Sequence, residues 1–199
     1  MIFQKMEKEK SMINKNSSTL IVNLFGGPSV GKSTVAAGVF SLLKLHGVEC
    51  GLVTEYAKDL VWEERHKTFK DQQYIFAKQH HRLWRVVDKV DVIITDSPLI
   101  LNQVYGDIYK TTNKKFNDNV IDVVSNFNNY NILLTRTKKY NPNCRNQTED
   151  QAKEIDSIIR RTLESYSMGF VEVPGNSSGI NKITRLLLKT KRRFKIGDL

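Results

Sequence analysis

The sequence predicts one α/β domain built on a parallel sheet of five strands with helices on both faces. Two observations support this prediction. Short apolar runs alternate with segments of helical periodicity along most of the chain. The runs are apolar throughout, as strands are when both faces of their sheet are covered. The length of 199 residues is that of a single globular domain.

Five segments are predicted as strands. Each is short, apolar and bounded by glycine, proline or polar turn residues. In chain order they span residues 20–25, 48–54, 91–95, 131–135 and 170–173. The first ends at a glycine, and the third ends at Asp96.

The first predicted helix starts at Lys32 and stops at Gly47, because glycine readily forms the left-handed cap of a helix. Residues 56–89 predict two further helices. The second of them is expected to place four large apolar side chains on one face. These are Phe76, Leu83, Trp84 and Val87.

Three helices are predicted in the second half of the chain. Apolar residues from Phe116 to Phe127 recur at the spacing of a helix with one buried stripe. Thr148 and Gln151 form a capping-box pattern that predicts the start of the next helix. Its buried face is expected to hold Ala152, Ile155, Ile159 and Leu163. Residues 174–179 predict a turn, and Ile180 begins the apolar pattern of the last helix.

The formal net charge of +10 is concentrated at the two ends of the chain. Residues 1–15 and 182–199 account for +8 of it, so the body carries only +2. We therefore expect a loosely attached tail at 1–18, a domain at 19–188 and a basic tail at 189–199. The basic tail is either solvated or a contact for DNA or another anionic surface.

The composition excludes several classes of protein. With 40% apolar and 26% charged residues, the chain is neither disordered nor collagen-like. Cys50 and Cys144 lie far apart and outside any CxxC pattern, which favours a reducing compartment. No apolar stretch has the length of a signal peptide or a membrane span. We expect a cytoplasmic protein that does not enter a membrane.

A phosphate-binding loop is the most specific pattern in the chain. The residues are Gly26, Gly27, Pro28, Ser29, Val30, Gly31, Lys32 and Ser33, followed by Thr34. They fit G-x-x-x-x-G-K-[ST] between a predicted strand and a predicted helix. Backbone N–H groups of such a loop cradle phosphates, and Lys32 adds a mobile cation for the β- and γ-phosphates. The loop predicts ATP as cofactor.

Two side chains are candidate Mg²⁺ ligands. Ser33 is the loop hydroxyl placed to hold a Mg²⁺ ion that bridges the phosphates. In proteins with this loop a carboxylate at the end of a strand completes the metal site, and Asp96 has that position. Alternatively, Asp96 only caps the next turn.

The sequence resembles the P-loop kinases of nucleosides and nucleotides over about residues 19–188. It is most similar to the group that contains the ribosylnicotinamide kinase domain and small phage-encoded ATP-binding proteins. The resemblance rests on four segments: 26–34, Glu55-Tyr56-Ala57, Asp96-Ser97-Pro98 and Arg145-Asn146-Gln147-Thr148-Glu149. It implies a P-loop NTPase fold of the nucleotide-kinase type and transfer of the γ-phosphoryl group of ATP, with Mg²⁺, to a nucleoside- or nucleotide-type acceptor.

The resemblance also implies roles for residues outside the loop. Glu55 has the place of the carboxylate that accepts the acceptor's proton, although it could instead cap the following helix. Residues 136–148 stand where such kinases carry a basic lid, with Arg136 and Arg145 as its arginines; a solvated loop is the alternative. Asn176 lies in the turn where related kinases pack the adenine. The arginine that often follows the strand-terminal aspartate in nucleoside kinases is absent after Asp96.

The helices between 56 and 87 are expected to form the acceptor pocket. They contain aromatic and amide side chains that could stack on a base and bind its edge, or could belong to the core. These residues are Tyr56, Trp62, Arg65, Gln73, Phe76 and Gln79.

Two other functions are compatible with this sequence. One is a DNA kinase that acts on a modified base such as 5-hydroxymethyluracil in phage DNA, with the basic tail at 189–199 holding the DNA. The other is a nucleotide-dependent switch or small ATPase that acts through a protein partner. The second is disfavoured because neither an arginine finger nor sensor motifs follow the fourth predicted strand.

Overall fold

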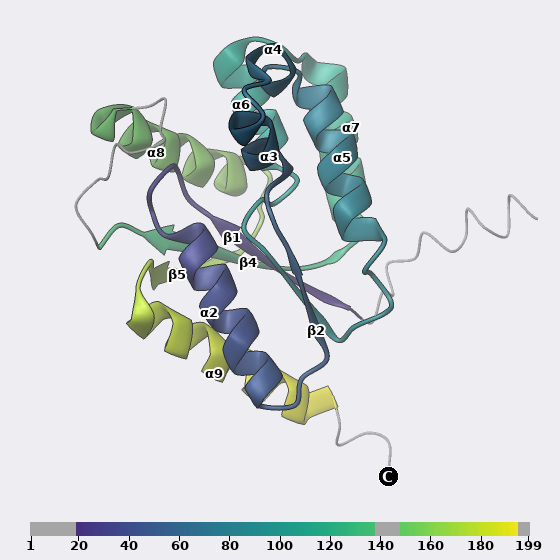
Figure 1. Cartoon of the computed structure of the whole chain (residues 1–199), viewed down its shortest axis with the longest axis vertical. Coiled ribbons are helices and arrows are strands. Elements are labelled where there is room, and N and C mark those ends of the chain that lie inside the picture. The colour runs from purple at the N-terminus through teal and green to yellow at the C-terminus, as the bar shows by residue number, and fades with distance from the viewer. Residues whose placement is uncertain (1–18, 138–147, 195–199) are drawn as a thin grey trace, which may run out of the picture.

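The computed structural model describes residues 19–137 and 148–194. Five strands form one sheet in the order β2-β3-β1-β4-β5, and all neighbours are parallel (Figure 1). The strands are β1 (Leu20–Phe25), β2 (Cys50–Val53), β3 (Val92–Thr95), β4 (Asn128–Thr135) and β5 (Phe170–Pro174). The predicted fold class, a five-stranded parallel sheet with helices on both faces, is confirmed.

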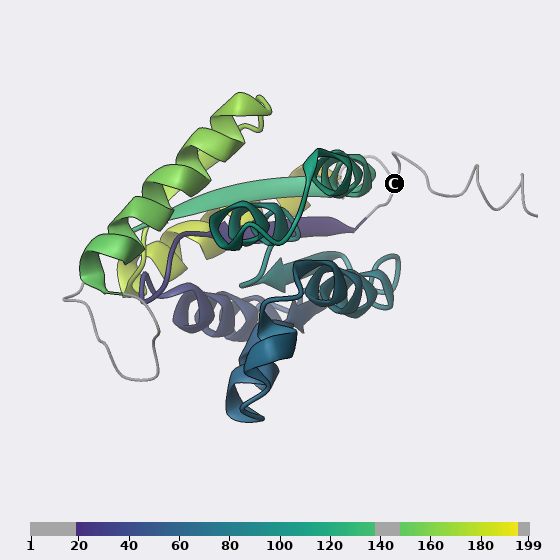
Figure 2. The ribbon, with the colours of Figure 1, turned by 90° about the horizontal axis from the view of Figure 1, so that it is seen from above.

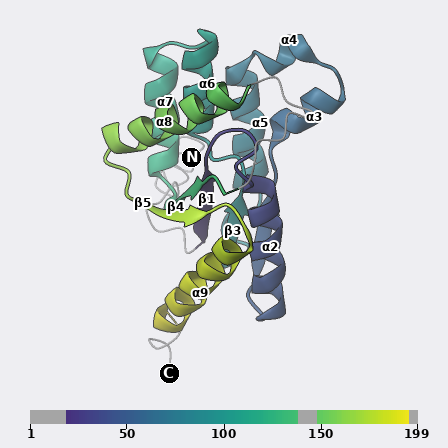
Figure 3. The same cartoon turned by 90° about the vertical axis from the view of Figure 1, so that its left-hand side faces the viewer.

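Helices cover both faces of this sheet. They are α2 (Lys32–Leu45), α3 (Tyr56–Trp62), α4 (His66–Phe69), α5 (Gln72–Trp84), α6 (Leu101–Tyr109), α7 (Lys114–Ser125), α8 (Glu149–Ser165) and α9 (Ser177–Phe194). Helices α2 and α9 pack on one face, and α5 to α8 pack on the other (Figure 3). The α3 and α4 segment projects from this body (Figure 2). None of the described helices is long and apolar enough to cross a membrane.

The alternation of side chains along β1 explains the two core layers. Val22 and Leu24 point to the α2 and α9 side, whereas Ile21 and Phe25 point to the opposite side. All four are at most 2% exposed. A central strand buried on both faces is mostly apolar, and this is why its run is visible in the sequence; Asn23 is the one polar residue of β1.

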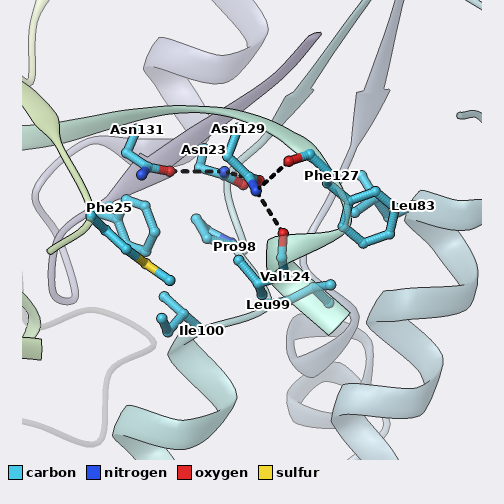
Figure 4. A pocket seen from close by; sticks show the side chains of 11 residues that line it. Asn23, Phe25, Leu83, Pro98, Leu99, Ile100, Val124, Phe127, Asn129 and Asn131 are labelled. Atoms are coloured by element: carbon cyan, nitrogen blue, oxygen red, sulfur yellow. Dashed lines mark hydrogen bonds between the residues drawn. The ribbon is translucent and has the colours of Figure 1, made fainter. Parts of the chain in front are cut away.

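Three asparagines join β1 to the neighbouring strand β4 between two apolar clusters (Figure 4). Asn23 Nδ2 on β1 donates to Asn129 Oδ1 at 2.9 Å and to Asn131 Oδ1 at 3.0 Å, both on β4. Asn129 Nδ2 donates in turn to the carbonyls of Val124 and Phe127. These amides bind one another beside a small pocket, so they let β4 begin with polar residues. The strand therefore starts three residues before the predicted range of 131–135.

The helices depart from the sequence prediction in three places. Residues 56–89 form three helices, α3 to α5, where two are predicted. Helix α6 is missing from the prediction because Asn102 and Gln103 interrupt its apolar pattern. Both amides are nevertheless buried, since Asn102 donates to the Leu99 carbonyl and Gln103 donates to the hydroxyl of Tyr166. Helix α9 continues to Phe194, beyond the predicted boundary at 188.

The predicted buried faces hold for α8 and fail in part for α5. The capping box of Thr148 and Gln151 is present, and the four predicted apolar residues of α8 are buried. On α5, Phe76 and Leu83 are buried, but Trp84 is 62% exposed. Trp84 is the last residue of the helix, and its ring stacks on that of His81 with centroids 6.3 Å apart.

The stability of the fold is expected to fall when the pH drops below about 6.5. His80 on α5 stacks on Phe76 with ring centroids 6.1 Å apart. Burial, with a smaller effect of His81, lowers the pKa of His80 below the ordinary value of 6.5. The unfolded chain therefore takes up the proton first, and acid favours unfolding. Urea unfolding at pH 7.5 and 5.5 tests this: His80→Phe should lose less stability over this interval than the wild type, whereas exposed His46→Gln should behave like the wild type.

Candidate functional site

Each of the five strands delivers a candidate residue to the same edge of the sheet. Parallel pairing places all their carboxyl ends together, and ligands of open α/β sheets bind outside those ends. The candidates that directly follow β1 to β5, or follow within two residues, are Gly26, Glu55, Asp96, Arg136 and Asn176. The predicted site residues in the described part of the chain therefore lie at one edge.

The phosphate loop curls back on itself between β1 and α2. Gly31 has a φ of 105°, and a Cβ there would lie 2.6 Å from the carbonyl oxygen of Gly175, so this position requires glycine. Ser29 has a φ of 63°, a strained conformation of the kind that concentrates at functional sites. Lys32 Nζ donates to the carbonyls of Gly26 at 2.6 Å and Gly27 at 3.1 Å. Its ammonium group thus lies against the loop.

Helix α8 and Arg136 brace the outside of this loop. The N–H of Gly27 donates to Asp156 Oδ1 at 2.5 Å, and Arg136 Nε donates to Asp156 Oδ2 at 2.5 Å. Arg136 also donates to the carbonyls of Pro28 at 2.8 Å and Ala152 at 3.0 Å. A Cβ on Gly27 would lie 2.7 Å from the Ala152 carbonyl oxygen, so only glycine permits this approach. Three nitrogens of Arg136 are therefore used to hold the loop.

Asp156 is a site residue that the sequence pattern does not reveal. It lies on α8 between the buried positions Ile155 and Ile159, and a carboxylate there is also compatible with an exposed helix face. Its partners, Gly27 and Arg136, are 129 and 20 residues away in the chain. The signal for Asp156 that the sequence does contain is its position directly next to the buried apolar face of α8.

Removing the Asp156 carboxylate is expected to weaken nucleotide binding and to lower stability. Asp156→Ala leaves the half-buried Arg136 guanidinium without its counter-charge. Because this ion pair is partly exposed, its loss should lower the free energy of unfolding by about 1–3 kcal/mol. The loop N–H of Gly27 also loses its acceptor. Thermal unfolding and titration with an ATP analogue measure both effects. Glu154→Ala, which breaks an exposed ion pair on the same helix, should change neither; equal behaviour of the two variants would contradict the brace.

Asp96 and Ser33 have the chemistry of a Mg²⁺ site. Asp96 is 2% exposed, and its Oδ1 has no hydrogen-bond partner among the described residues. A buried carboxylate oxygen without a partner fits a metal ion or its bound water. Mg²⁺ is commonly held by one or two carboxylates together with substrate phosphates. The residues present therefore fit the ion that the loop implies.

A lysine from α3 joins these two side chains. Lys58 Nζ donates to Ser33 Oγ and, at 3.2 Å, to Asp96 Oδ2. The same Nζ lies 3.9 Å from Glu55 Oε2. Sequence reasoning missed Lys58 because a lysine on a short helix is usually solvated.

Glu55 occupies the N-cap position of α3, but its side chain makes no capping hydrogen bond within the described part of the chain. The buried amide of Gln79 serves that turn instead. It accepts from the N–H of Tyr56 at 2.9 Å and donates to the Thr54 carbonyl at 3.3 Å. The carboxylate of Glu55 therefore faces Lys58, toward the phosphate loop.

The expected acceptor residues are not gathered in one pocket. Gln79 and Phe76 are buried, Trp62 is 76% exposed, and Arg65 pairs with Glu63 at the surface. Of Trp62, Phe76 and Trp84, only Phe76 is buried in the core.

Tyr56 does belong to a polar cluster of α3 and α5. It donates to the hydroxyl of Tyr74 at 3.1 Å, a bond that raises the pKa of Tyr56 and lowers that of Tyr74. The Arg82 guanidinium lies over the Tyr56 ring at 5.0 Å and pairs with Asp59.

An open hollow of about 510 Å³ lies between the end of β2 and α5. Thr54 and Tyr56, the neighbours of Glu55 in the chain, form part of its wall. Basic and imidazole side chains from one face of α5 and from its C-cap form another part. They are Lys78, His81, Arg82 and Arg85.

Asn176 and Arg145 are the two remaining candidate residues. Asn176 Oδ1 accepts from the N–H groups of Ser178 at 3.0 Å and Gly179 at 3.2 Å, so it caps α9. The turn that contains it touches the phosphate loop through Gly175 and Gly31. Arg145 and most of the expected lid lie outside the described residues.

The fold and the phosphate loop are those of a P-loop protein, and the fold resembles that of nucleotide kinases. A family model described as AAA domain matches residues 21–179, and the chain belongs to this family. A search of curated proteins gives no match.

Solved structures with a similar fold include a thymidylate kinase and a deoxyadenosine kinase. Thymidylate kinase from Ehrlichia chaffeensis is 13% identical, with a TM-score of 0.58 over 86% of this chain and 98% of that one. Deoxyadenosine kinase from M. mycoides is 17% identical, with a TM-score of 0.55 over 87% and 99%. NadR protein in complex with NR is 13% identical, with a TM-score of 0.53 over 85% of this chain and 51% of that one. At these identities the likeness is one of fold.

Proposed function

We propose that this protein is a kinase that transfers the γ-phosphoryl group of ATP, with Mg²⁺, to a hydroxyl or phosphate of a nucleoside- or nucleotide-type acceptor. One observation supports this most directly. A single atom, Lys58 Nζ, is within 4 Å of the loop hydroxyl of Ser33, the strand-terminal carboxylate of Asp96 and the carboxylate of Glu55. A phosphate-binding loop, a metal ligand and a candidate base thus surround one point.

The proposed roles follow from this arrangement. The loop N–H groups and Lys32 bind the triphosphate, and Ser33 and Asp96 hold the Mg²⁺, which supplies charge neutralisation to the phosphates. Glu55 accepts the proton of the acceptor hydroxyl as its oxygen forms a bond to the γ-phosphorus. The bond from that phosphorus to the bridging oxygen breaks, and ADP leaves with the electron pair. A turn at Asn176 next to the loop is proposed to pack the adenine.

The lid assignment of Arg136 and Arg145 remains part of this proposal. In this structure Arg136 braces the loop, and its guanidinium contacts the loop at the carbonyl of Pro28. Its guanidinium nevertheless adds positive potential beside the phosphate site, which favours an anionic ligand. Residues 136–148 are proposed to close over the nucleotide and exclude water.

The test is incubation with labelled ATP and a panel of nucleosides, mononucleotides and duplex DNA with and without modified bases. Label that moves to one class of acceptor identifies the reaction. If ATP is consumed at the same rate with and without every acceptor, the proposed transfer is wrong and a nucleotide-dependent switch or small ATPase is the better description.

A second candidate, a kinase acting on a modified base in DNA, is favoured by the face of α5. Lys78, His81, Arg82 and Arg85 recur at the spacing of one helical stripe and line the hollow beside Thr54 and Tyr56. Such a stripe suits a phosphate backbone that leads to Glu55. DNA binding should then fall steeply with salt, and Lys78→Glu with Arg85→Glu should reduce it more than removal of 189–199 does.

A further inference from the structure

Lys58 lies on α3 one turn after Glu55, and its ammonium group joins oxygens from three elements. It donates to Ser33 Oγ at the start of α2 and to Asp96 Oδ2 after β3, and it is 3.9 Å from Glu55 Oε2. These three side chains lie on different elements, and one ammonium group is close to all of them. Lys58 is therefore the cation at the centre of the site.

The charge of Lys58 compensates a deeply buried carboxylate. The side chain of Asp96 is 3% exposed, and a carboxylate at that depth is strongly disfavoured without a counter-charge. Lys58 contacts only Oδ2, however, while Oδ1 has no partner among the described residues. A single ammonium group thus satisfies half of this carboxylate, and the other half fits a second cation or its water.

Lys58 and a metal–nucleotide complex compete for the same oxygens. Ser33 Oγ and Asp96 are the groups proposed to hold Mg²⁺, and an ion that binds Ser33 Oγ and Asp96 Oδ2 has to displace the ammonium group from them, although Asp96 Oδ1 is open to it. Lys58 is 29% exposed, and Ser33 lies on an exposed turn of α2. A four-carbon side chain can therefore leave these oxygens without displacing α3.

We infer that Lys58 is an exchangeable counter-ion of the metal site. It neutralises Asp96 and donates to Ser33 Oγ before nucleotide binds, and then moves to lie between Glu55 and the triphosphate. There its positive charge offsets the repulsion between the Glu55 carboxylate and the phosphates, so Lys58 is a positioning residue for the candidate base. This second role rests on the proposed function, whereas the exchange itself concerns only nucleotide binding.

A double-mutant cycle without nucleotide tests the first half of the inference. Lys58→Met leaves Asp96 buried without its counter-charge and should lower Tm by about 4–8 °C in EDTA. The added Asp96→Asn removes the unpaired charge and should recover most of this loss, even if Lys58→Met alone does not fold. Lys114→Met, which breaks an exposed ion pair on α7, is the matched control and should leave Tm unchanged. A double variant no more stable than Lys58→Met overturns the counter-ion.

Nucleotide titrations test the exchange. The readout is the affinity for a non-hydrolysable ATP analogue in Mg²⁺ divided by the affinity in EDTA. Lys58→Met removes the ammonium group that competes with Mg²⁺, so the affinity in Mg²⁺ should rise. It also removes a positive charge that attracts the metal-free nucleotide, so the affinity in EDTA should fall. The ratio should therefore rise roughly tenfold. Lys58→Arg, which keeps the charge, should return it toward the wild-type value. An unchanged ratio in Lys58→Met overturns the inference. A raised ratio in a protein that transfers phosphate to no acceptor supports the exchange and rejects only the proposed kinase function.

Discussion

Lys32→Ala is expected to reduce phosphoryl transfer by about 10²–10³-fold, because the variant lacks the loop cation that follows the β- and γ-phosphates through the reaction. The ammonium group already lies at the mouth of the loop, 2.6 Å from the Gly26 carbonyl oxygen. Its loss leaves the loop N–H groups in place, so some nucleotide binding should persist. Transfer of label from ATP at saturating nucleotide measures the effect on the chemical step.

The matched control for Lys32→Ala lies on the same helix. Lys44 is exposed in the last turn of α2, so Lys44→Ala also removes a lysine charge from the helix. It should retain wild-type transfer within about twofold, since a surface charge at the far end of the helix is screened. Similar rates for the two variants would show that the loop does not bind the reacting phosphates.

The parts of this molecule that local pattern determines were predictable from sequence. A strand buried on both faces is mostly apolar, so β1 and β3 stand out as apolar runs in which only Asn23 and Thr95 are polar. The phosphate loop is equally local, because consecutive residues supply its glycines and its lysine. Parallel topology then follows from the alternation of strands and helices, and it brings Glu55 and Asp96 to the edge where the loop lies.

The parts that sequence could not supply depend on contacts between distant segments. Asp156 and Lys58 are ordinary charged residues on helices until the fold places them against Gly27 and Asp96. Helix α6 was hidden for the same reason, since the partner that makes Gln103 acceptable in the interior is Tyr166, 63 residues away. Periodicity detects burial of apolar groups, and buried polar groups with remote partners escape it.

Glu55→Gln is expected to reduce transfer to a hydroxyl acceptor by about 10²–10⁴-fold while leaving the affinity for nucleotide nearly unchanged. The amide keeps the size of the side chain but cannot accept the hydroxyl proton. Since Glu55 makes no capping bond in the described part of the chain, and Gln79 holds the turn, the fold of α3 should survive the change. Rates from labelled ATP, with separate titration of an ATP analogue, distinguish chemistry from binding.

The same variant also reports which group of the acceptor is phosphorylated. An acceptor phosphate is already ionised and needs no base, so Glu55→Gln should slow its phosphorylation far less than that of a hydroxyl. Glu63→Gln, an exposed change at the other end of α3, is the control and should leave both reactions unchanged. If transfer to a hydroxyl acceptor proceeds at the wild-type rate in Glu55→Gln while Lys32→Ala abolishes it, Glu55 is not the base. The loop and Asp96 would then have to act with a proton acceptor from another element.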